Sequence, residues 1–156
     1  MISNSEQRFL DYKSIACESD SFEKIIANGT AIVDIGGNSM QISVFDKDHL
    51  ITTQNIRVGK ISTRERFHEA VESSHHYNKM VTEVLEHELN GFAKLYKKDR
   101  PIQNLIVSDP DLLELVRRHY EDILHAGPPE HPDVFEVSVE TFESLYERMM
   151  TMSADD

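Results

Sequence analysis

The chain is 156 residues long and carries 16 Lys or Arg against 28 Asp or Glu, a net charge of -12 at pH 7. This acidity argues against nucleic acid as a partner, because such binders need a basic face, and no apolar run approaches the roughly 20 residues of a membrane helix, so no membrane partner is expected. The single cysteine, Cys17, excludes an internal disulfide and fits a cytoplasmic protein, and the first residues do not resemble a secretory signal.

The first half of the chain is predicted to hold short helices and then strands. Two helices and a turn come first, over residues 4–16, 21–27 and 28–29. Three strands follow, over residues 31–35, 40–45 and 50–58. The second strand alternates, with Met40, Ile42 and Val44 on one side. Because tight turns join the three strands, they are expected to pair antiparallel.

After Gly59 the apolar spacing becomes helical, and helices are predicted over residues 62–72 and 77–97. The longer helix has one apolar stripe, made of Val81, Leu85, Leu89, Phe92 and Tyr96. The remaining elements alternate between strand and helix, over residues 102–107, 110–123, 134–139 and 140–152. Asp109 and Pro110 are predicted as the N-cap and first position of a helix. The last helix is expected to turn Phe142, Leu145 and Met149 inward.

This order of elements predicts a single α/β domain over residues 1–156. Its sheet is expected to be mixed and five-stranded, an antiparallel three-strand meander followed by alternating helices and strands, with helices on both faces. Within the domain we expect an N-terminal helical segment, a core and a short tail, over residues 1–28, 30–152 and 153–156.

The stretch most informative about chemistry lies between the first two strands and reads Asp34-Ile35-Gly36-Gly37-Asn38-Ser39-Met40-Gln41. Glycines permit positive φ and let a ligand approach the backbone. Successive N–H groups in such a turn form a concavity for anions, to which Ser39 adds a hydroxyl. Asp34 ends the strand, and an acid beside a phosphate commonly holds Mg²⁺ or orients a water. The alternative is a plain hairpin turn to which Asp34 simply hydrogen-bonds.

Two further segments have a recognisable pattern. Upstream lies Ile2-Ser3-Asn4-Ser5-Glu6-Gln7-Arg8, and downstream lie Asn55-Ile56-Arg57-Val58-Gly59 and Arg64-Glu65-Arg66-Phe67. Together with the glycine turn, these segments resemble the Ppx/GppA family of exopolyphosphatases and pppGpp phosphohydrolases, within the sugar-kinase/actin superfamily. The resemblance covers residues 2–67 and rests on element order beyond them. It implies a ribonuclease-H-like fold, and specifically the second half of an actin-like two-domain phosphatase.

The resemblance also implies roles for individual residues. Glu6 falls on the family's catalytic base, which activates water for attack on a terminal phosphoryl group. Asp34 falls on the acid near phosphate and metal, with Mg²⁺ as the expected cofactor. The residues that fall on the phosphate-binding turn are Gly36, Gly37, Asn38 and Ser39, and Gln41 is counted with them. The implied activity is removal of terminal phosphate from polyphosphate or from the guanosine nucleotide pppGpp.

The sequence departs from the family pattern at several of these positions. Asn38 replaces a glycine, and Gln41 replaces a Glu. Where the family has a second glycine-rich turn, this chain reads Ser108-Asp109-Pro110-Asp111, which offers fewer N–H donors and more repulsion to a phosphate. The Asp-x-Gly turn of the family's first half does not precede Glu6. We therefore expect the chain to need the missing N-terminal half of the same protein as its partner and to be inactive alone.

Two other interpretations stay open at this stage. In the first, the chain is a degenerate relative that binds phosphate or a nucleotide to regulate a partner. In the second, it is an interaction module with an ordinary glycine hairpin. A homodimer is not excluded. The choice between polyphosphate and pppGpp is also open, because no base-reading residues can be identified.

Overall fold

A computed structural model of the chain describes residues 22–47, 49–67, 74–96, 101–124 and 134–151. The predicted helix over residues 4–16, and Glu6 with it, lies outside these ranges. The chain divides into two compact units, one ending at Asp109 and one beginning at Pro110, and each is described by itself. No helix in the described ranges combines the length and apolarity needed to cross a membrane.

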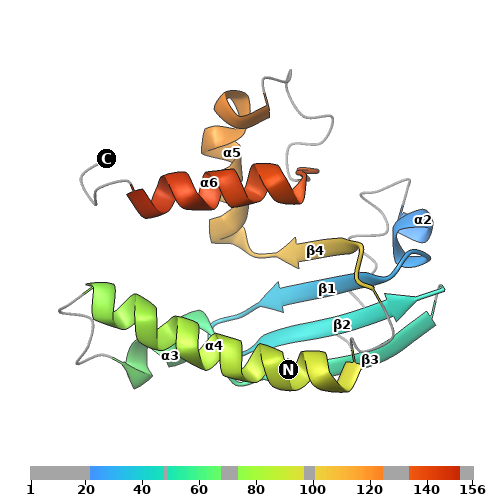
Figure 1. Cartoon of the computed structure of the whole chain (residues 1–156), viewed down its shortest axis with the longest axis horizontal. Helices are drawn as coiled ribbons and strands as arrows, with labels where there is room; N and C mark the ends of the chain where they lie inside the picture. The colour runs from blue at the N-terminus through green and yellow to red at the C-terminus, as the bar shows by residue number, and fades with distance from the viewer. Residues whose placement is uncertain (1–21, 48, 68–73, 97–100, 125–133, 152–156) are drawn as a thin grey trace, which may run out of the picture. The chain divides into compact units, whose positions relative to one another are not determined.

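The first unit is built on a mixed four-stranded sheet with the strand order β3-β2-β1-β4 (Figure 1). Its strands are β1 (Thr30–Ile35), β2 (Met40–Asp46), β3 (His49–Ile56) and β4 (Asn104–Ser108). The first three strands pair antiparallel, as the tight turns between them require, and β4 pairs parallel to β1. The predicted meander and the mixed α/β class are confirmed.

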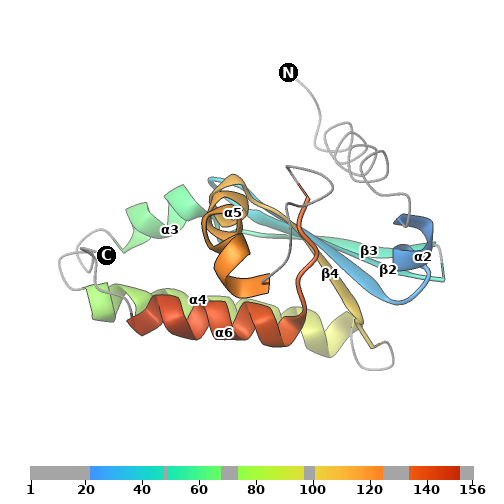
Figure 2. The same ribbon diagram turned by 90° about the horizontal axis from the view of Figure 1, so that it is seen from above.

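Helices flank the strands of this unit. They are α2 (Phe22–Ile26), α3 (Lys60–Arg66) and α4 (Ser74–Tyr96). Between α2 and β1 the predicted turn is present, and Gly29 has a φ of +64°, a conformation that glycine adopts without strain. The longest helix, α4, runs along one face of the sheet (Figure 2).

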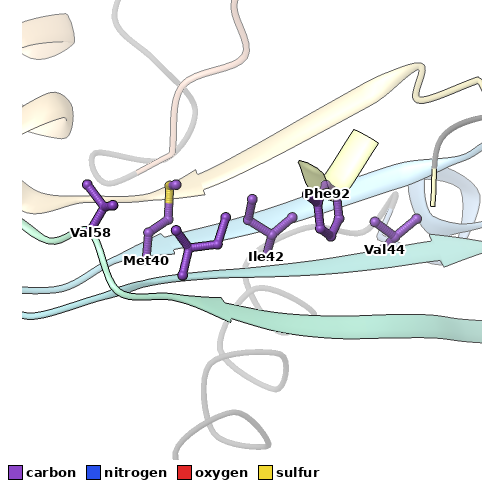
Figure 3. Packing of buried hydrophobic residues seen from close by; sticks show 6 residues of the cluster. Met40, Ile42, Val44, Val58 and Phe92 are labelled. Atoms are coloured by element: carbon purple, nitrogen blue, oxygen red, sulfur yellow. The ribbon is translucent and has the colours of Figure 1, made fainter. Parts of the chain in front are cut away.

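The core of the first unit lies between that face and α4. It contains Met40, Ile42 and Val44, which are expected to share one side of β2, together with Ile56, Val58 and Phe92 (Figure 3). Phe92 comes from α4, and its ring also contacts Tyr96 with 5.1 Å between ring centroids. The alternation along β2 therefore correctly predicts that these three residues share a side, and the structure shows that α4 covers that side.

The apolar stripe predicted for α4 agrees only in part with the residues that pack against the core. Leu85, Phe92 and Tyr96 belong to the core or pack against it, but Leu89 is 39% exposed. Val84 packs against the core as well. Val84 and Leu85 are neighbours that both border the core, so the contact stripe is wide at this turn of the helix and does not include Leu89.

The second unit contains α5 (Pro110–Leu124) and α6 (Val139–Thr151), which contact each other. Pro110 is the first residue of α5, as predicted from its fixed φ and missing N–H. In α6, Leu145 is buried as predicted, whereas Phe142 is 41% exposed, so its predicted inward orientation is wrong.

The predicted fifth strand, over residues 134–139, is not seen. Val134 forms only an isolated bridge, residues 135–138 are irregular, and α6 begins at Val139. The reason is local: the Oγ of Ser138 accepts a hydrogen bond from the Thr141 N–H at 3.1 Å, which caps the first turn of α6. The alternating apolar residues thus lead into the N-cap of α6 and do not form a strand.

Candidate functional site

The glycine turn joins β1 to β2 in a tight hairpin. Ile35 and Met40 are paired across the two strands, and the Gly36 N–H donates to the Ser39 carbonyl at 3.0 Å. Asn38 is exposed, while the glycines and Ser39 are half-buried. The turn therefore stands at the edge of the sheet where β1 ends, with its tip accessible.

Positive φ, one of the two roles predicted for the glycines of this turn, is not found there. None of Gly36, Gly37 and Asn38 has a positive φ. What the glycines supply is room, because a Cβ on Gly36 would lie 3.2 Å from the Ser39 carbonyl oxygen and one on Gly37 would lie 3.0 Å from the Ile61 Cδ1. The demand for glycine comes from close packing around the turn rather than from its own backbone conformation.

The start of α3 holds the carbonyl side of the turn. The Lys60 N–H donates to the Gly36 carbonyl at 3.2 Å, and the Gly37 carbonyl accepts from the N–H groups of Ile61 at 2.7 Å and Ser62 at 3.1 Å. These donors belong to the first turn of a helix, where N–H groups have no partner within the helix itself. The turn and the helix therefore satisfy each other's backbone groups.

The side chain of Ser62 completes this attachment. Its Oγ accepts the Gly59 N–H at 3.0 Å and donates to the Asn38 carbonyl at 3.1 Å, sharing its proton with the Gly59 carbonyl at 3.3 Å. With the Gly36 N–H on Ser39, every carbonyl of residues 36–39 has a donor from the protein. The sequence pattern did not single out Ser62, although its position three residues after Gly59 is typical of a helix start.

The direction of the amides follows from this arrangement. In a trans peptide the C=O of one residue and the N–H of the next point to opposite sides of the same plane. Because the carbonyls of residues 36–38 point to α3, the N–H groups of Gly37, Asn38 and Ser39 point away from it. Among the hydrogen bonds of the described residues, none uses these three amides, whereas the Gly36 amide is bonded to Ser39. The Gly36 amide thus stabilises the turn by its hydrogen bond to Ser39.

A row of polar residues crosses the sheet beside the turn. Asp34 is the partner of Gln41 on β2 and of Ser108 on β4, and Gln41 is in turn the partner of Asn55 on β3. Paired residues present their side chains on the same face, about 4.5–5.5 Å apart at Cβ. The tertiary structure therefore brings the sequence-predicted Asp34 and Gln41 together, and the sheet edge next to the turn is polar.

Asp109, which directly follows β4, adds a second carboxylate to this edge. Burial raises the pKa of the Asp34 carboxyl above its usual range, and the negative charge of Asp109 raises it further. The Asp109 side chain is only 7% exposed and forms an ion pair with the Lys60 Nζ at 3.0 Å. The repulsion that Asp109 brings can be predicted from the sequence, but its partner Lys60 cannot, because it lies 49 residues away along the chain.

The donor set suits a magnesium ion in part. Within the described ranges, no group of three or more His, Cys, Asp or Glu side chains is placed to hold a metal. Mg²⁺ is, however, often bound by one or two carboxylates together with substrate phosphates and waters. Asp34, half-buried beside the turn and near a second carboxylate, fits that pattern. Any metal here would depend on the phosphate for its remaining ligands.

Comparison with solved structures gives matches to Ppx/GppA proteins. A Ppx/GppA enzyme of Aquifex aeolicus aligns at 15% identity and a TM-score of 0.53, over 84% of this chain and 44% of that chain. An exopolyphosphatase of Cytophaga hutchinsonii aligns at 16% identity and a TM-score of 0.54, over 79% of this chain and 39% of that chain. The chain shares its fold with Ppx/GppA proteins.

A second structure of the Aquifex aeolicus Ppx/GppA family member aligns over 98% of this chain and 53% of that chain, at 13% identity and a TM-score of 0.53. Neither a protein-family model nor a curated protein matches the chain. At these identities the similarity is one of fold, and it agrees with the resemblance found in the sequence. The chain spans between 39% and 53% of the length of the Ppx/GppA structures that it matches.

Proposed function

We propose that the chain forms one wall of a phosphate-binding cleft in a phosphohydrolase that removes terminal phosphate from polyphosphate or pppGpp. The observation that carries this proposal is the orientation of the turn: its carbonyls are bonded to protein donors, and the amides of Gly37, Asn38 and Ser39 point away from α3 without a protein acceptor in the described ranges. Consecutive amides of this kind form a concavity that attracts anions. The Ppx/GppA fold supports the same assignment.

The proposal gives each residue a limited role. The three amides and the Ser39 hydroxyl contact phosphate oxygens, and Asp34, with Gln41 beside it, faces the metal and its waters. Mg²⁺, when bound there, would neutralise phosphate charge. Glu6 stays a prediction as the base that activates water, since it lies outside the described residues. Phosphoryl transfer needs charge stabilisation from several directions, so a single wall is expected to bind without turning over.

An NMR titration of the chain with tripolyphosphate in the presence of Mg²⁺ tests the binding part. The amide resonances of Gly37, Asn38 and Ser39 are expected to shift together with one dissociation constant. The Gly36 amide is an internal control, because it is bonded to the Ser39 carbonyl and should move less. Shifts confined to exposed Lys and Arg residues, with these three amides unchanged, would contradict the proposal.

Phosphate release tests the catalytic part. The chain alone is expected to release no appreciable phosphate from polyphosphate or pppGpp, and robust turnover would contradict the assignment as one wall of a cleft. In a protein that contains the N-terminal half as well, Glu6→Ala is expected to abolish release while leaving binding in place. Retained full activity of that variant would end the assignment of Glu6 as base.

A second candidate is a non-catalytic module that binds phosphate or a nucleotide and regulates a partner. Two observations favour it: Gln41, rather than an acid, stands beside Asp34, and Asp109 is held in an ion pair near the turn. Binding of pppGpp or polyphosphate without release, in a protein that contains both halves, would favour this candidate over the hydrolase.

A further inference from the structure

Asp109 presents an electrostatic difficulty for the proposed site. It follows β4 directly, and its charge acts on Asp34, which lies within the polar row beside the turn. Its side chain is almost completely buried, so water screens it poorly. An uncompensated carboxylate at this place would repel a phosphate that approaches the amides of residues 37–39.

Lys60 contacts both the glycine turn and Asp109. Its backbone N–H is bonded to the Gly36 carbonyl, which holds Lys60 at the base of the turn. Its side chain forms the ion pair with Asp109, with 3.0 Å between Nζ and Oδ1, and remains 39% exposed. One residue therefore anchors the turn through its main chain and neutralises the nearby acid through its side chain.

We propose that Lys60 is a positioning residue that neutralises Asp109 and thereby allows a phosphate to bind at the turn of residues 36–39. This inference rests on the proposed phosphate-binding function and adds to it the residue that makes an acidic edge compatible with an anionic ligand. Lys60 acts through Asp109, and it need not contact the ligand. The arrangement also explains how the chain tolerates an acid where the resembling family has a glycine-rich turn.

A double-mutant cycle separates this role from direct contact with phosphate. The variants are Lys60→Met, which removes the charge but keeps an unbranched side chain, Asp109→Asn, and the two combined. Lys60→Arg keeps the charge and is the conservative rescue. Lys94→Met is the matched control for net charge, because Lys94 is exposed and lies away from the turn. It comes two residues after Phe92 on α4. Phe92 packs beside Val44, at the end of the core away from Met40 and Val58 (Figure 3).

The affinity of each variant for tripolyphosphate is measured by calorimetry, with a thermal melt to verify folding. We expect Lys60→Met to weaken binding about tenfold, because a like charge facing a ligand is strongly unfavourable. Lys60→Arg should bind like the wild type. Lys94→Met should stay within about twofold, since distant exposed charges are screened by salt. In the Asp109→Asn background, Lys60→Met should have little effect.

Three results would overturn the inference. Equal losses for Lys60→Met with and without Asp109→Asn would mean that Lys60 acts independently of Asp109. Binding by Asp109→Asn but not by the wild type would mean that Lys60 fails to neutralise Asp109, while the turn would still be a phosphate site. Absence of binding by all variants, including Asp109→Asn, would remove the proposed function and this inference with it. If Lys60→Met does not fold, Lys60→Gln takes its place in the cycle.

Discussion

A Cβ atom on Gly59 would lie 2.4 Å from the backbone nitrogen of Ser39, and 2.5 Å from both the Asn38 carbonyl carbon and the Gly37 carbonyl oxygen. All three are main-chain atoms of the glycine turn, so they cannot swing aside as a flexible side chain would. Gly59 is thus the point at which the end of the β3 region and the β1–β2 turn pack backbone against backbone. Its φ of −134° is open to any residue, and the requirement for glycine is one of space.

The first prediction concerns this contact. Gly59→Ala is expected to lower the free energy of unfolding by about 1–3 kcal/mol, since the added methyl group overpacks a rigid site. Urea unfolding measures the change. Gly91→Ala is the matched control, because a Cβ there meets nothing within 4 Å and Gly91 lies inside α4, so it should stabilise by about 0.5–1 kcal/mol. Equal effects of the two substitutions would show that the packing at Gly59 is not tight.

The second prediction concerns the attachment of the turn to α3. Ser62→Ala removes the hydroxyl that accepts the Gly59 N–H and donates to the Asn38 carbonyl. The expected loss is about 1 kcal/mol of unfolding free energy, the usual net contribution of such hydrogen bonds. Tripolyphosphate should also bind more weakly, because the Asn38 carbonyl is no longer held toward α3. Ser62→Thr keeps the hydroxyl and should retain most of the stability and most of the affinity for tripolyphosphate. If Ser62→Ala and the wild type were the same in both measurements, Ser62 would not attach the turn to α3.

The third prediction tests which residues of α4 form the core. Phe92 is 9% exposed and packs against the apolar face of β2, whereas Leu89 is 39% exposed. Phe92→Ala should cost about 3–5 kcal/mol through lost burial and the cavity that remains. Leu89→Ala should cost well under half as much, because it empties no packed site. Chemical denaturation of both variants measures the difference, and a larger loss at Leu89 would restore the stripe predicted from spacing alone.

The fourth prediction is a dependence of stability on pH. The pKa of Asp34 is raised from its ordinary value of 3.8, first by burial and then by Asp109, so the fold disfavours the ionised form. Asp34 therefore costs stability above the pH at which it ionises in the unfolded chain, and this cost disappears as the pH falls below 3.8. Asp34→Asn should accordingly raise the unfolding free energy at pH 7 and lose that advantage near pH 3.

Urea unfolding at the two pH values measures this difference. Glu83→Gln, on an exposed position of α4, removes the same charge elsewhere and should show no comparable gain. An Asp34→Asn variant that is less stable than the wild type at pH 7 would mean that the carboxylate has favourable partners which outweigh its burial. That result would also weaken the proposal that the Asp34 carboxylate binds a metal cation.

Much of the fold could be predicted because its signals are local. The alternation along β2 places Met40, Ile42 and Val44 on one side of the strand, and the turn residues between the first strands predict antiparallel pairing. Pro110 correctly predicts the start of α5. Local signals also misled: the alternating residues 134–139 indicate a strand, but the helix cap at Ser138 ends the segment before a ladder forms.

By itself the sequence determined the order of the elements from α2 to α5 and the place of the glycine turn, because periodicity and turn chemistry depend on residues only a few positions apart. Only the tertiary structure decided which side of that turn faces α3, and that Lys60 meets Asp109 at a separation of 49 residues. Those features depend on how β1, β4 and α3 come together in space. Distances between residues far apart in the chain are set by packing, which no local pattern records.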